Sequence, residues 1–410
     1  MNWFHTFFGN RDGTDPLRDW NTRNLSVGMV SMLMALTGPP VFILQAAASG
    51  GYSLEQAVHW MFATFLFGGL FGIFVPLYYR TPIVGAQTIT GLAYLTTVTH
   101  QFSYNELVGA FIVSGLIIFI VGYFGVFAKL IRYVPREIIS AMLAGIIVKF
   151  MIDLIVAIEQ MIVVGLAALL AFFICLKSLQ RIPPMIAAIF VGIVVLFLTQ
   201  PVEFSEMSLS FSMLTWQSPE FSVVSIIAVS IPLALLILSN DAAVGIAALQ
   251  QNGYRIDVNR IITLSGVFSM IAAVFGGQSA NIAGMMSAIC SDQEAGPKEK
   301  RYIAPVFAGV MFVFIGIFAW KLLPFVNALP QAFIAMIVGF SLLAVFANSL
   351  SIGFSNPSRR MSTAIAFAIS ASNISVFHIS APVWALLIGT LIARFVEGEP
   401  EKKIEEQKAS

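Results

Sequence analysis

Two short polar segments interrupt the apolar sequence of this chain in the same way. Residues 85–90 read Gly-Ala-Gln-Thr-Ile-Thr, and residues 276–281 read Gly-Gly-Gln-Ser-Ala-Asn. Each segment combines Gly, which allows close approach and unusual backbone angles, with side chains that donate and accept hydrogen bonds. Such segments suit the binding of a small polar or anionic molecule by amides, hydroxyls and backbone N–H groups.

The polar side chains of the two segments are the candidate substrate-binding residues. A lone segment of this kind would favour the simpler interpretation that small and polar residues let helices pack closely. Two segments with one pattern favour a binding site. The candidates correspond pairwise along the pattern: Gln87 with Gln278, Thr88 with Ser279, and Thr90 with Asn281.

One acidic residue lies deep within an apolar run. Asp241 occurs in "LLILSNDAAVGIAAL", whereas nearly all other acidic residues lie in predicted loops or at the ends of apolar runs. A carboxylate at the centre of a membrane helix costs about 2.5–3.5 kcal/mol on insertion scales, unless it faces a cavity or is protonated. We therefore predict that Asp241 carries a coupling proton and that neighbouring Asn240 contacts the substrate. The alternative is a protonated Asp241 that only joins helices through hydrogen bonds.

The first apolar run contains a helix-breaking sequence at its middle. Thr37, Gly38, Pro39 and Pro40 lie in "MALTGPPVFILQ". Because Pro lacks an amide N–H and clashes with the preceding turn, the helix must kink or unwind there. The break is expected either to flank the binding site or to serve packing alone.

The elements that position these residues are membrane-spanning helices. Of 410 residues, 58% are hydrophobic and only 10% are charged, with a mean hydropathy of +0.88. Soluble domains have about 25% charged residues. The net charge of +1 and the lack of a long basic run indicate no nucleic-acid partner. We find no P-loop, nucleophile elbow or metal-ligand spacing, and we expect no cofactor, no metal and no enzymatic activity.

Fourteen apolar runs are candidate spans, and a helix needs about 20 apolar residues to cross a bilayer. Two of them, 84–99 and 277–290, are too short to cross as straight helices, and these contain the two polar segments. The runs are 25–48, 54–78, 84–99, 106–128, 137–157, 159–177, 183–200, 222–250, 259–276, 277–290, 302–322, 330–350, 360–378 and 381–396.

The charge distribution predicts the orientation of these spans. If the N-terminus is cytoplasmic and the chain alternates sides, all of the 22 Lys and Arg residues except Lys149 and Lys321 lie on the cytoplasmic side. This is the asymmetry of the positive-inside rule. We therefore predict a multi-pass protein of a bacterial-type inner (plasma) membrane with both termini cytoplasmic. Lys149 is expected to extend outward or to pair with Asp153 one turn further on.

The order of the two short spans predicts an inverted repeat. They are the third and the tenth spans, so each is the third of a set of seven. Because seven is odd, the second set enters the membrane from the opposite side, and transporters with such repeats bind substrate at the midplane on discontinuous helices. The helices that begin after the two segments would then direct their electropositive N-termini at one pocket, which suits an anion or a polar ring with carbonyl groups.

Five stretches of the chain resemble the benzoate/proton symporter (BenE-type) family, a relative of the uracil and xanthine permeases. Together they extend over essentially the whole sequence. They are "YRTPIVGAQTITGLAYL" (79–95), "VPREIISAMLAGIIVKF" (134–150), "NDAAVGIAALQQNGY" (240–254), "FGGQSANIAGMMSAIC" (275–290) and "LPQAFIAMIVGFSLL" (329–343).

The resemblance implies two domains with the substrate between them. The core (transport) domain would comprise residues 24–132 and 222–326, and the gate (scaffold) domain residues 133–221 and 327–396. Cytoplasmic segments would be 1–23 and 397–410. Related permeases carry an acidic residue near Asn240 and Asp241 and polar residues near Gln278 and Asn281, and they imply a homodimer through the gate domain.

The chain departs from the family pattern at the expected site. Gln87 stands where the family has an aromatic residue, Gln278 stands where it has His, and Asp241 is an added carboxylate. An ionised Asp241 would repel an anionic substrate, whereas proton coupling would neutralise it and a nucleobase would tolerate it. We predict proton-coupled import of a small organic anion such as benzoate or another aromatic carboxylate. The alternatives are a nucleobase (uracil/xanthine-like) proton symporter and a passive anion channel.

Overall fold

The computed structural model describes residues 14–127, 135–178, 182–200, 214–372, 374, 376 and 381–397. Residues 1–13 and 398–410 make up most of the two predicted cytoplasmic segments and lie outside the described residues. Within the described part of the chain, seven helices are long and apolar enough to cross a membrane, and four shorter apolar helices accompany them. The chain is therefore an all-helical membrane protein, as its composition predicts.

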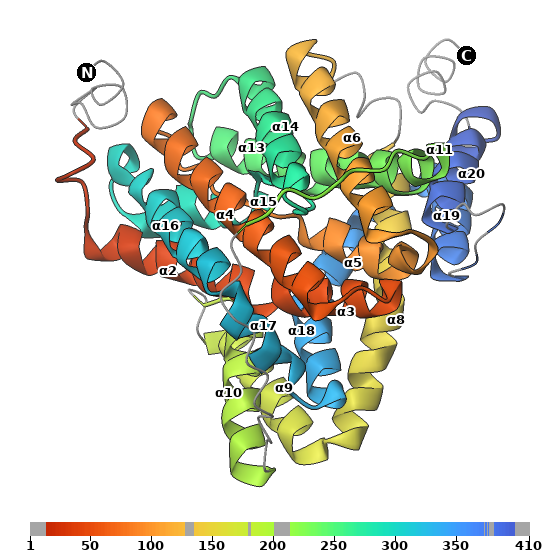
Figure 1. Cartoon of the computed structure of the whole chain (residues 1–410), viewed down its shortest axis with the longest axis horizontal. Helices are drawn as coiled ribbons and strands as arrows, with labels where there is room; N and C mark the ends of the chain where they lie inside the picture. The colour runs from red at the N-terminus through yellow and green to blue at the C-terminus, as the bar shows by residue number, and fades with distance from the viewer. Residues whose placement is uncertain are drawn as a thin grey trace.

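The first half of the chain begins with two helices, a long helix and a half-helix that follows an extended segment (Figure 1). Three further helices, α8 to α10, project from one side of the molecule. The elements are α2 (Thr22–Thr37), α3 (Pro39–Gly50), α4 (Leu54–Tyr79), β1 (Gly85–Ala86), α5 (Ile89–Val98), η1 (Thr99–Gln101), α6 (Tyr104–Tyr123), α8 (Arg136–Gln160), α9 (Ile162–Ser178) and α10 (Pro184–Thr199).

The second half follows the same order, beginning with one helix that contains two π-helical turns, η2 and η3. Its elements are α11 (Val223–Ser225), η2 (Ile226–Ser230), α12 (Ile231–Leu236), η3 (Ile237–Ala242), α13 (Ala243–Gln251), α14 (Val258–Val274), β2 (Asn281–Ile282), α15 (Gly284–Ser291), η4 (Gln293–Ala295), η5 (Lys298–Lys300), α16 (Ile303–Ile317), α17 (Ala319–Asn327), α18 (Gln331–Gly353), η6 (Pro357–Arg359), α19 (Arg360–Ser372) and α20 (Ala381–Phe395).

Local sequence explains where several helices begin. At the start of α4, the Ser53 hydroxyl accepts a hydrogen bond from the Gln56 amide at 3.1 Å, and the Gln56 side chain accepts one from the Ser53 amide at 2.9 Å. Ser103 and Glu106 form the same reciprocal cap at the start of α6. Such capping boxes satisfy amide groups that have no partner inside the helix.

The first apolar run is interrupted where its sequence contains Gly and Pro. Helix α2 ends at Thr37 and α3 begins at Pro39, so Gly38 separates the two helices. Pro39 and Pro40 occupy the first positions of α3, where a missing amide N–H costs least.

The two polar segments predicted to interrupt spans are extended and lie against each other. Strand β1 pairs with β2 in antiparallel register, with Gly85 opposite Ile282 and Ala86 opposite Asn281. The pairing satisfies backbone groups that would otherwise be unbonded inside a membrane, where each would cost several kcal/mol.

Glycine allows β1 to lie directly on α4. A Cβ atom on Gly85 would collide with the Gly68 carbonyl oxygen and would lie 2.5 Å from the Gly72 amide nitrogen. No larger residue at position 85 fits without separating the strand from the helix.

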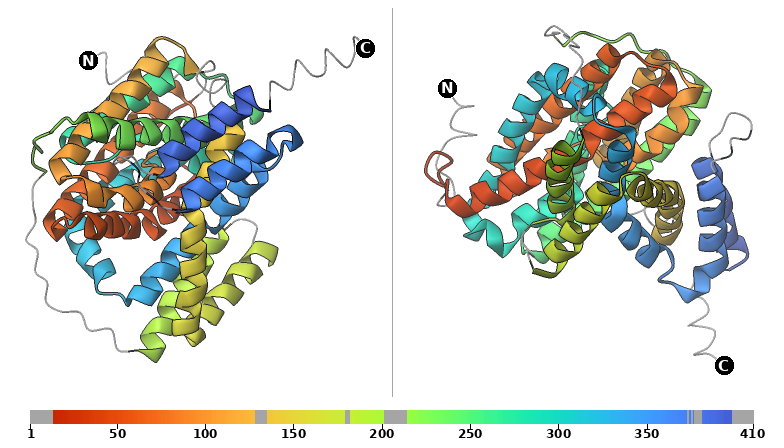
Figure 2. Two further views of the ribbon diagram at one scale, coloured as in Figure 1. Left: turned by 90° about the vertical axis from the view of Figure 1, so that its right-hand side faces the viewer. Right: turned by 90° about the horizontal axis from the view of Figure 1, so that it is seen from below.

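The helices form two groups of contacts. In one group, α4 packs on α16, α6 packs on α14, and α2 packs on α16. In the other, α8 packs on α18 and α19, α9 packs on α10, and α19 packs on α20. Figure 2 shows α9 and α10 extending away from the first group, with α19 and α20 on another side.

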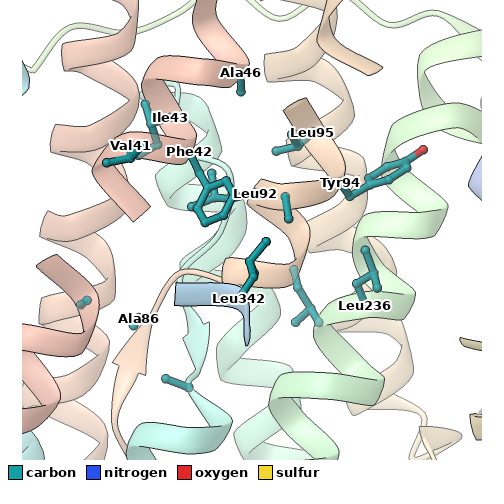
Figure 3. Close-up of a cluster of buried hydrophobic side chains, with 14 of the residues drawn as sticks. Val41, Phe42, Ile43, Ala46, Ala86, Leu92, Tyr94, Leu95, Leu236 and Leu342 are labelled. Atoms are coloured by element: carbon teal, nitrogen blue, oxygen red, sulfur yellow. The ribbon is translucent and has the colours of Figure 1, made fainter. Parts of the chain in front are cut away.

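The buried core continues across the region of the paired strands. Phe42 of α3, Leu92 of α5 and Leu342 of α18 are fully buried or nearly so, and Figure 3 shows them in one cluster with Ala86 of β1. An apolar layer therefore joins the half-helices to α18 of the other group.

We predict that Gly85→Ala destabilises the protein by roughly 3 kcal/mol, the upper end for overpacking. The added methyl group would collide with the backbone of α4. Gly51→Ala is the matched control, since Gly51 has a φ of 69° but nothing within 4 Å of an added Cβ, and its expected cost is about 1–2 kcal/mol. Thermal unfolding of the purified protein in detergent measures both. Equal losses would contradict the proposed packing of β1 on α4.

Candidate functional site

A hydrogen-bond network joins the two extended segments beyond their strand pairing. The Gln278 side-chain amide donates to the Thr88 carbonyl at 3.3 Å and to the Ser279 hydroxyl at 3.0 Å. The Ser279 hydroxyl also accepts from the Thr88 amide at 3.3 Å. All three residues are buried, so the structure brings together residues that are about 190 positions apart in the sequence.

Thr88 and Thr90 organise the start of α5. The Thr88 hydroxyl accepts a hydrogen bond from the Gly91 amide at 3.1 Å, which caps the helix, and it lies 3.0 Å from the Thr90 hydroxyl. The Thr88 side chain also interacts with the carboxyl group of Asp241. Thr88 therefore links the first segment to the acidic residue.

The N-terminus of α15 has no side-chain cap. Its N-cap residue is Ala283, whose own amide donates to the Val84 carbonyl at 2.9 Å. The amides of Gly284, Met285 and Met286 belong to the first turn, so they lack partners within the helix. The electropositive end of α15 is thus available to an anion.

Asp241 lies in the π-helical turn η3, directly beside the start of α15. A Cβ atom on Gly284 would lie 2.8 Å from the Asp241 carbonyl oxygen and 3.0 Å from that of Asn240. Gly284 therefore allows the two helices to approach closely. Single π-helical turns inside α-helices are frequent at functional sites.

A cavity of about 530 Å³ lies between the two groups of helices. Gln87, Asp241 and the first residues of α15 line it on one side, and residues of α9, α10 and α18 line it on the other. Phe172 and Phe340 are stacked, with ring centroids 5.7 Å apart and an interplanar angle of 27°. Both line the cavity, so its far wall is aromatic.

Two side chains of the cavity have unpaired polar atoms. Among the described residues, the Gln87 Nε2 and Asp241 Oδ2 atoms are buried and have no hydrogen-bond partner. Buried polar groups normally have partners. One donor and one carboxyl oxygen are therefore available to a bound molecule in this cavity.

The other candidate residues lie behind the cavity wall rather than in it. Gln278, Ser279 and Asn281 are buried in the contact between the two segments, and the Asn281 side-chain amide donates to the Ile282 carbonyl at 2.9 Å. The Asn240 side chain donates to the Ser239 hydroxyl at 3.2 Å and does not line the cavity.

The break between α2 and α3 also reaches the cavity. Pro39 lines it, and an added Cβ on Gly38 would lie 3.0 Å from Ile89 and 3.2 Å from Ser341. Thr37 only donates a hydrogen bond to the Met34 carbonyl at 3.1 Å.

Sequence reasoning did not single out the aromatic wall. Phe172, Phe340 and Ser341 line the cavity, yet single Phe and Ser residues in apolar runs carry no distinctive pattern. Phe340 and Ser341 lie in the stretch 329–343, whose family resemblance was the one available signal. Within the described ranges, no group of three or more His, Cys, Asp or Glu residues could hold a metal ion.

The fold is similar to those of two solved proteins. The structure resembles the transmembrane domain of a cyanobacterium bicarbonate transporter, BicA, with a TM-score of 0.60 and 16% sequence identity, covering 91% of this chain and 98% of that chain. It also resembles the overall structure of SLC26A9, with a TM-score of 0.59 and 13% identity, covering 92% of this chain and 65% of that one. At these identities the likeness concerns the fold alone.

The chain belongs to the BenE family, described as "Benzoate membrane transport protein", which matches residues 18–395. It is 30% identical over 367 residues to "Inner membrane protein YdcO" of Escherichia coli (strain K12), covering 89% of this chain and 93% of that protein. It is 28% identical over 385 residues to "Benzoate membrane transport protein" of Acinetobacter baylyi (strain ATCC 33305 / BD413 / ADP1), covering 94% and 97%. The chain is thus a member of a transporter family and not an enzyme.

We predict that Gln278→Ala lowers the stability of the protein more than Gln87→Ala does. The Gln278 side chain donates one hydrogen bond to the Thr88 carbonyl of the other segment and one to the neighbouring Ser279 hydroxyl, and both are lost in the variant. Each buried hydrogen bond contributes about 0.5–1.5 kcal/mol net. The Gln87 Nε2 atom donates no hydrogen bond among the described residues, so its removal should cost less. Thermal unfolding in detergent, without added ligand, compares the two. A larger loss for Gln87→Ala would contradict this assignment.

Proposed function

We propose that the protein imports an aromatic carboxylate such as benzoate together with a proton, by alternating access. The observation that carries the proposal is the cavity in which an aromatic wall faces the Asp241 carboxyl group and an uncapped helix N-terminus. Within the described part of the chain, the Oδ2 atom of Asp241 has no hydrogen-bond partner. These three features match the ring, the proton and the negative charge of the proposed substrates.

The shape and chemistry of the cavity support an aromatic carboxylate. Its volume of about 530 Å³ lies within the range of roughly 300–1,000 Å³ typical of small-molecule sites. In the proposed pose, the ring lies against Phe172 and Phe340, and the carboxylate accepts hydrogen bonds from the first amides of α15 and from Gln87. In the family pattern an aromatic residue stands at position 87, where this chain has Gln. Phe172 and Phe340 of the proposed gate domain would supply that aromatic surface instead.

The role proposed for Asp241 follows from its place beside this pose. An ionised Asp241 would repel the substrate carboxylate, because two like charges a few ångströms apart in a poorly solvated cavity interact strongly. Protonation of Asp241 removes that repulsion and supplies a hydrogen-bond donor. Substrate binding and proton binding would then favour each other, which is the requirement for symport.

Fourteen spans arranged as seven plus seven inverted are part of the proposal. In two such repeats, α4 corresponds to α14 and α16 corresponds to α6. The packing of α4 on α16 therefore has its counterpart in the packing of α14 on α6. In the same way, the packing of α3 on α5 has its counterpart in the packing of α13 on α15. Matching pairs of contacts are expected of two repeats related by a pseudo-two-fold axis.

Contacts between loops support the alternation of spans across the membrane. On the proposed cytoplasmic face, Asp19 accepts a hydrogen bond from Tyr302 at 2.9 Å and pairs with Lys300 at 3.0 Å. On the opposite face, the Tyr52 hydroxyl donates to the Phe102 carbonyl at 2.7 Å. Loops predicted on the same side therefore touch each other.

The cavity supports the division of the chain into two domains. The core domain comprises residues 24–132 and 222–326, and the gate domain comprises residues 133–221 and 327–396. The walls of the cavity come from both proposed domains, and the cavity extends to Leu176 and Pro183 beside the predicted cytoplasmic turn between α9 and α10. On the other side, Phe42 and Phe150 meet edge to face with ring centroids 5.8 Å apart. This arrangement supports an inward-facing state closed by an apolar layer.

The cellular location and the oligomeric state are proposed from fewer observations. The printed name of the Escherichia coli relative supports an inner-membrane location, and the positive-inside pattern supports cytoplasmic termini. A homodimer through the gate domain stays a prediction that only the family resemblance supports.

A nucleobase is the second candidate substrate. Gln87 and Asp241 together offer a donor and an acceptor to the edge of a uracil- or xanthine-like ring. The largely apolar and aromatic lining favours a substrate with one polar end, which benzoate has and a nucleobase lacks. A passive anion channel would not need Asp241 in the cavity.

We predict that cells expressing the protein accumulate labelled benzoate, but not labelled uracil, above the level of control cells without it. Accumulation should collapse when a protonophore abolishes the proton gradient. Uracil uptake without benzoate uptake would favour the nucleobase symporter. Benzoate entry that never exceeds equilibrium, with or without the gradient, would favour a channel.

We predict that Asp241→Asn abolishes gradient-driven accumulation but retains exchange of labelled for unlabelled benzoate. Asn mimics the neutral form of the carboxyl group, so the substrate still binds but no proton is carried. Glu159→Gln is the matched control, since it removes one negative charge from the exposed end of α8. Full accumulation by Asp241→Asn in proteoliposomes with an imposed pH gradient would refute the proton-carrier role.

A further inference from the structure

A second cavity lies between the two groups of helices, on the other side of the Phe42–Phe150 contact. Its volume is about 300 Å³, and Phe150 also lines it. Its polar lining comes from α3 and α5 of the proposed core and from α8 and α19 of the proposed gate. These polar residues are Gln45, Ser49, Thr96, Thr97, Lys149, Asp153 and Ser370.

Lys149 is the cation of this cavity, and its charge is not paired. It is exposed, and within the described residues no carboxylate lies within 4.0 Å of its ammonium group. Asp153 lines the same cavity one turn further on, but of the two alternatives expected for Lys149 the ion pair with Asp153 is not formed. Lys321, the other lysine predicted away from the cytoplasmic face, instead lies 4.9 Å over the ring of Trp320.

Some of the hydroxyl groups in the cavity are already committed as donors. The Thr96 and Thr97 hydroxyls donate to carbonyls of their own helix at 2.8 and 2.7 Å, and the Ser370 hydroxyl donates to the Met142 carbonyl at 2.8 Å. Gln45 and Ser49 make no side-chain hydrogen bond to other described residues. The donors open to a ligand are therefore Lys149 on the gate side and Gln45 and Ser49 on the core side.

We propose that this cavity is an outer docking site for the carboxylate group of an incoming anion, formed by Lys149 with Gln45 and Ser49. An unpaired ammonium group in a cleft with apolar walls concentrates anions near it. The proposal rests on the proposed function for the identity of the anion and for the side from which it arrives.

Asp153 limits the affinity of this site. Its carboxylate repels an anion held at Lys149, so the anion binds weakly and can move on when the Phe42–Phe150 contact opens. Opposite effects follow for two neighbouring variants: Lys149→Gln weakens the site, whereas Asp153→Asn strengthens it. A merely structural role of the cavity would not produce effects of opposite sign.

Protection of an introduced thiol tests the site without relying on transport. Ala371→Cys places a reporter in the cavity lining, and the native Cys175 and Cys290 are buried. Right-side-out membrane vesicles are treated with a membrane-impermeant thiol reagent, with and without benzoate, and the labelling rate is measured. Asn327→Cys is the control reporter, since Asn327 is exposed but lies outside the cavity.

Benzoate should at least halve the labelling rate of Ala371→Cys and leave Asn327→Cys unchanged. Adding Lys149→Gln should abolish the protection, Lys149→Arg and Lys321→Gln should retain it, and Asp153→Asn should lower the benzoate concentration needed. Protection that survives Lys149→Gln, or no protection at all, would overturn the proposal. Protection in a protein that does not accumulate benzoate would instead refute the proposed function and leave the docking site standing.

Discussion

The structure depends on the pairing of two extended segments where the helices of a membrane protein are interrupted. Backbone groups in a bilayer must be satisfied within the protein. Here β1 and β2 satisfy each other, and the Gln278 side chain adds donors to Thr88 and Ser279. Because this pairing holds the two segments, α5 and α15 can begin in the interior, and the uncapped end of α15 can face a cavity.

The same constraint explains the small residues around the pairing. Gly85 lies against the backbone of α4, and Gly284 lies against the turn that carries Asp241. A side chain at either position would separate elements that must touch. The binding cavity therefore forms where glycine permits close approach on one side and large aromatic residues of the other helix group complete the wall.

Much of this fold could be predicted from the sequence, because the signals are strong in a membrane. Long apolar runs identify the helices, Gly38 and Pro39 interrupt the first run, and the two short runs proved to contain the paired strands. The boundaries were harder: α6 ends at Tyr123, whereas the apolar run continues to 128, since composition alone does not mark a helix end.

The candidate site was predictable only in part. Residue types placed Gln87 and Asp241 among the candidates, and both line the cavity. Residue types alone could not distinguish Gln87 and Asp241 from Gln278 and Asn281, because the same polar side chains can bind a ligand or a backbone group. Gln278 and Asn281 belong to the contact behind the cavity wall. The aromatic wall depends on helices that meet only in the folded protein.

A structure of the protein with bound benzoate in a lipid nanodisc tests the central claim directly. We expect the carboxylate at the first amides of α15 beside Gln87 and Asp241, with the ring against Phe172 and Phe340. A cavity that stays empty of benzoate at saturating concentration, or β1 and β2 unpaired, would contradict it.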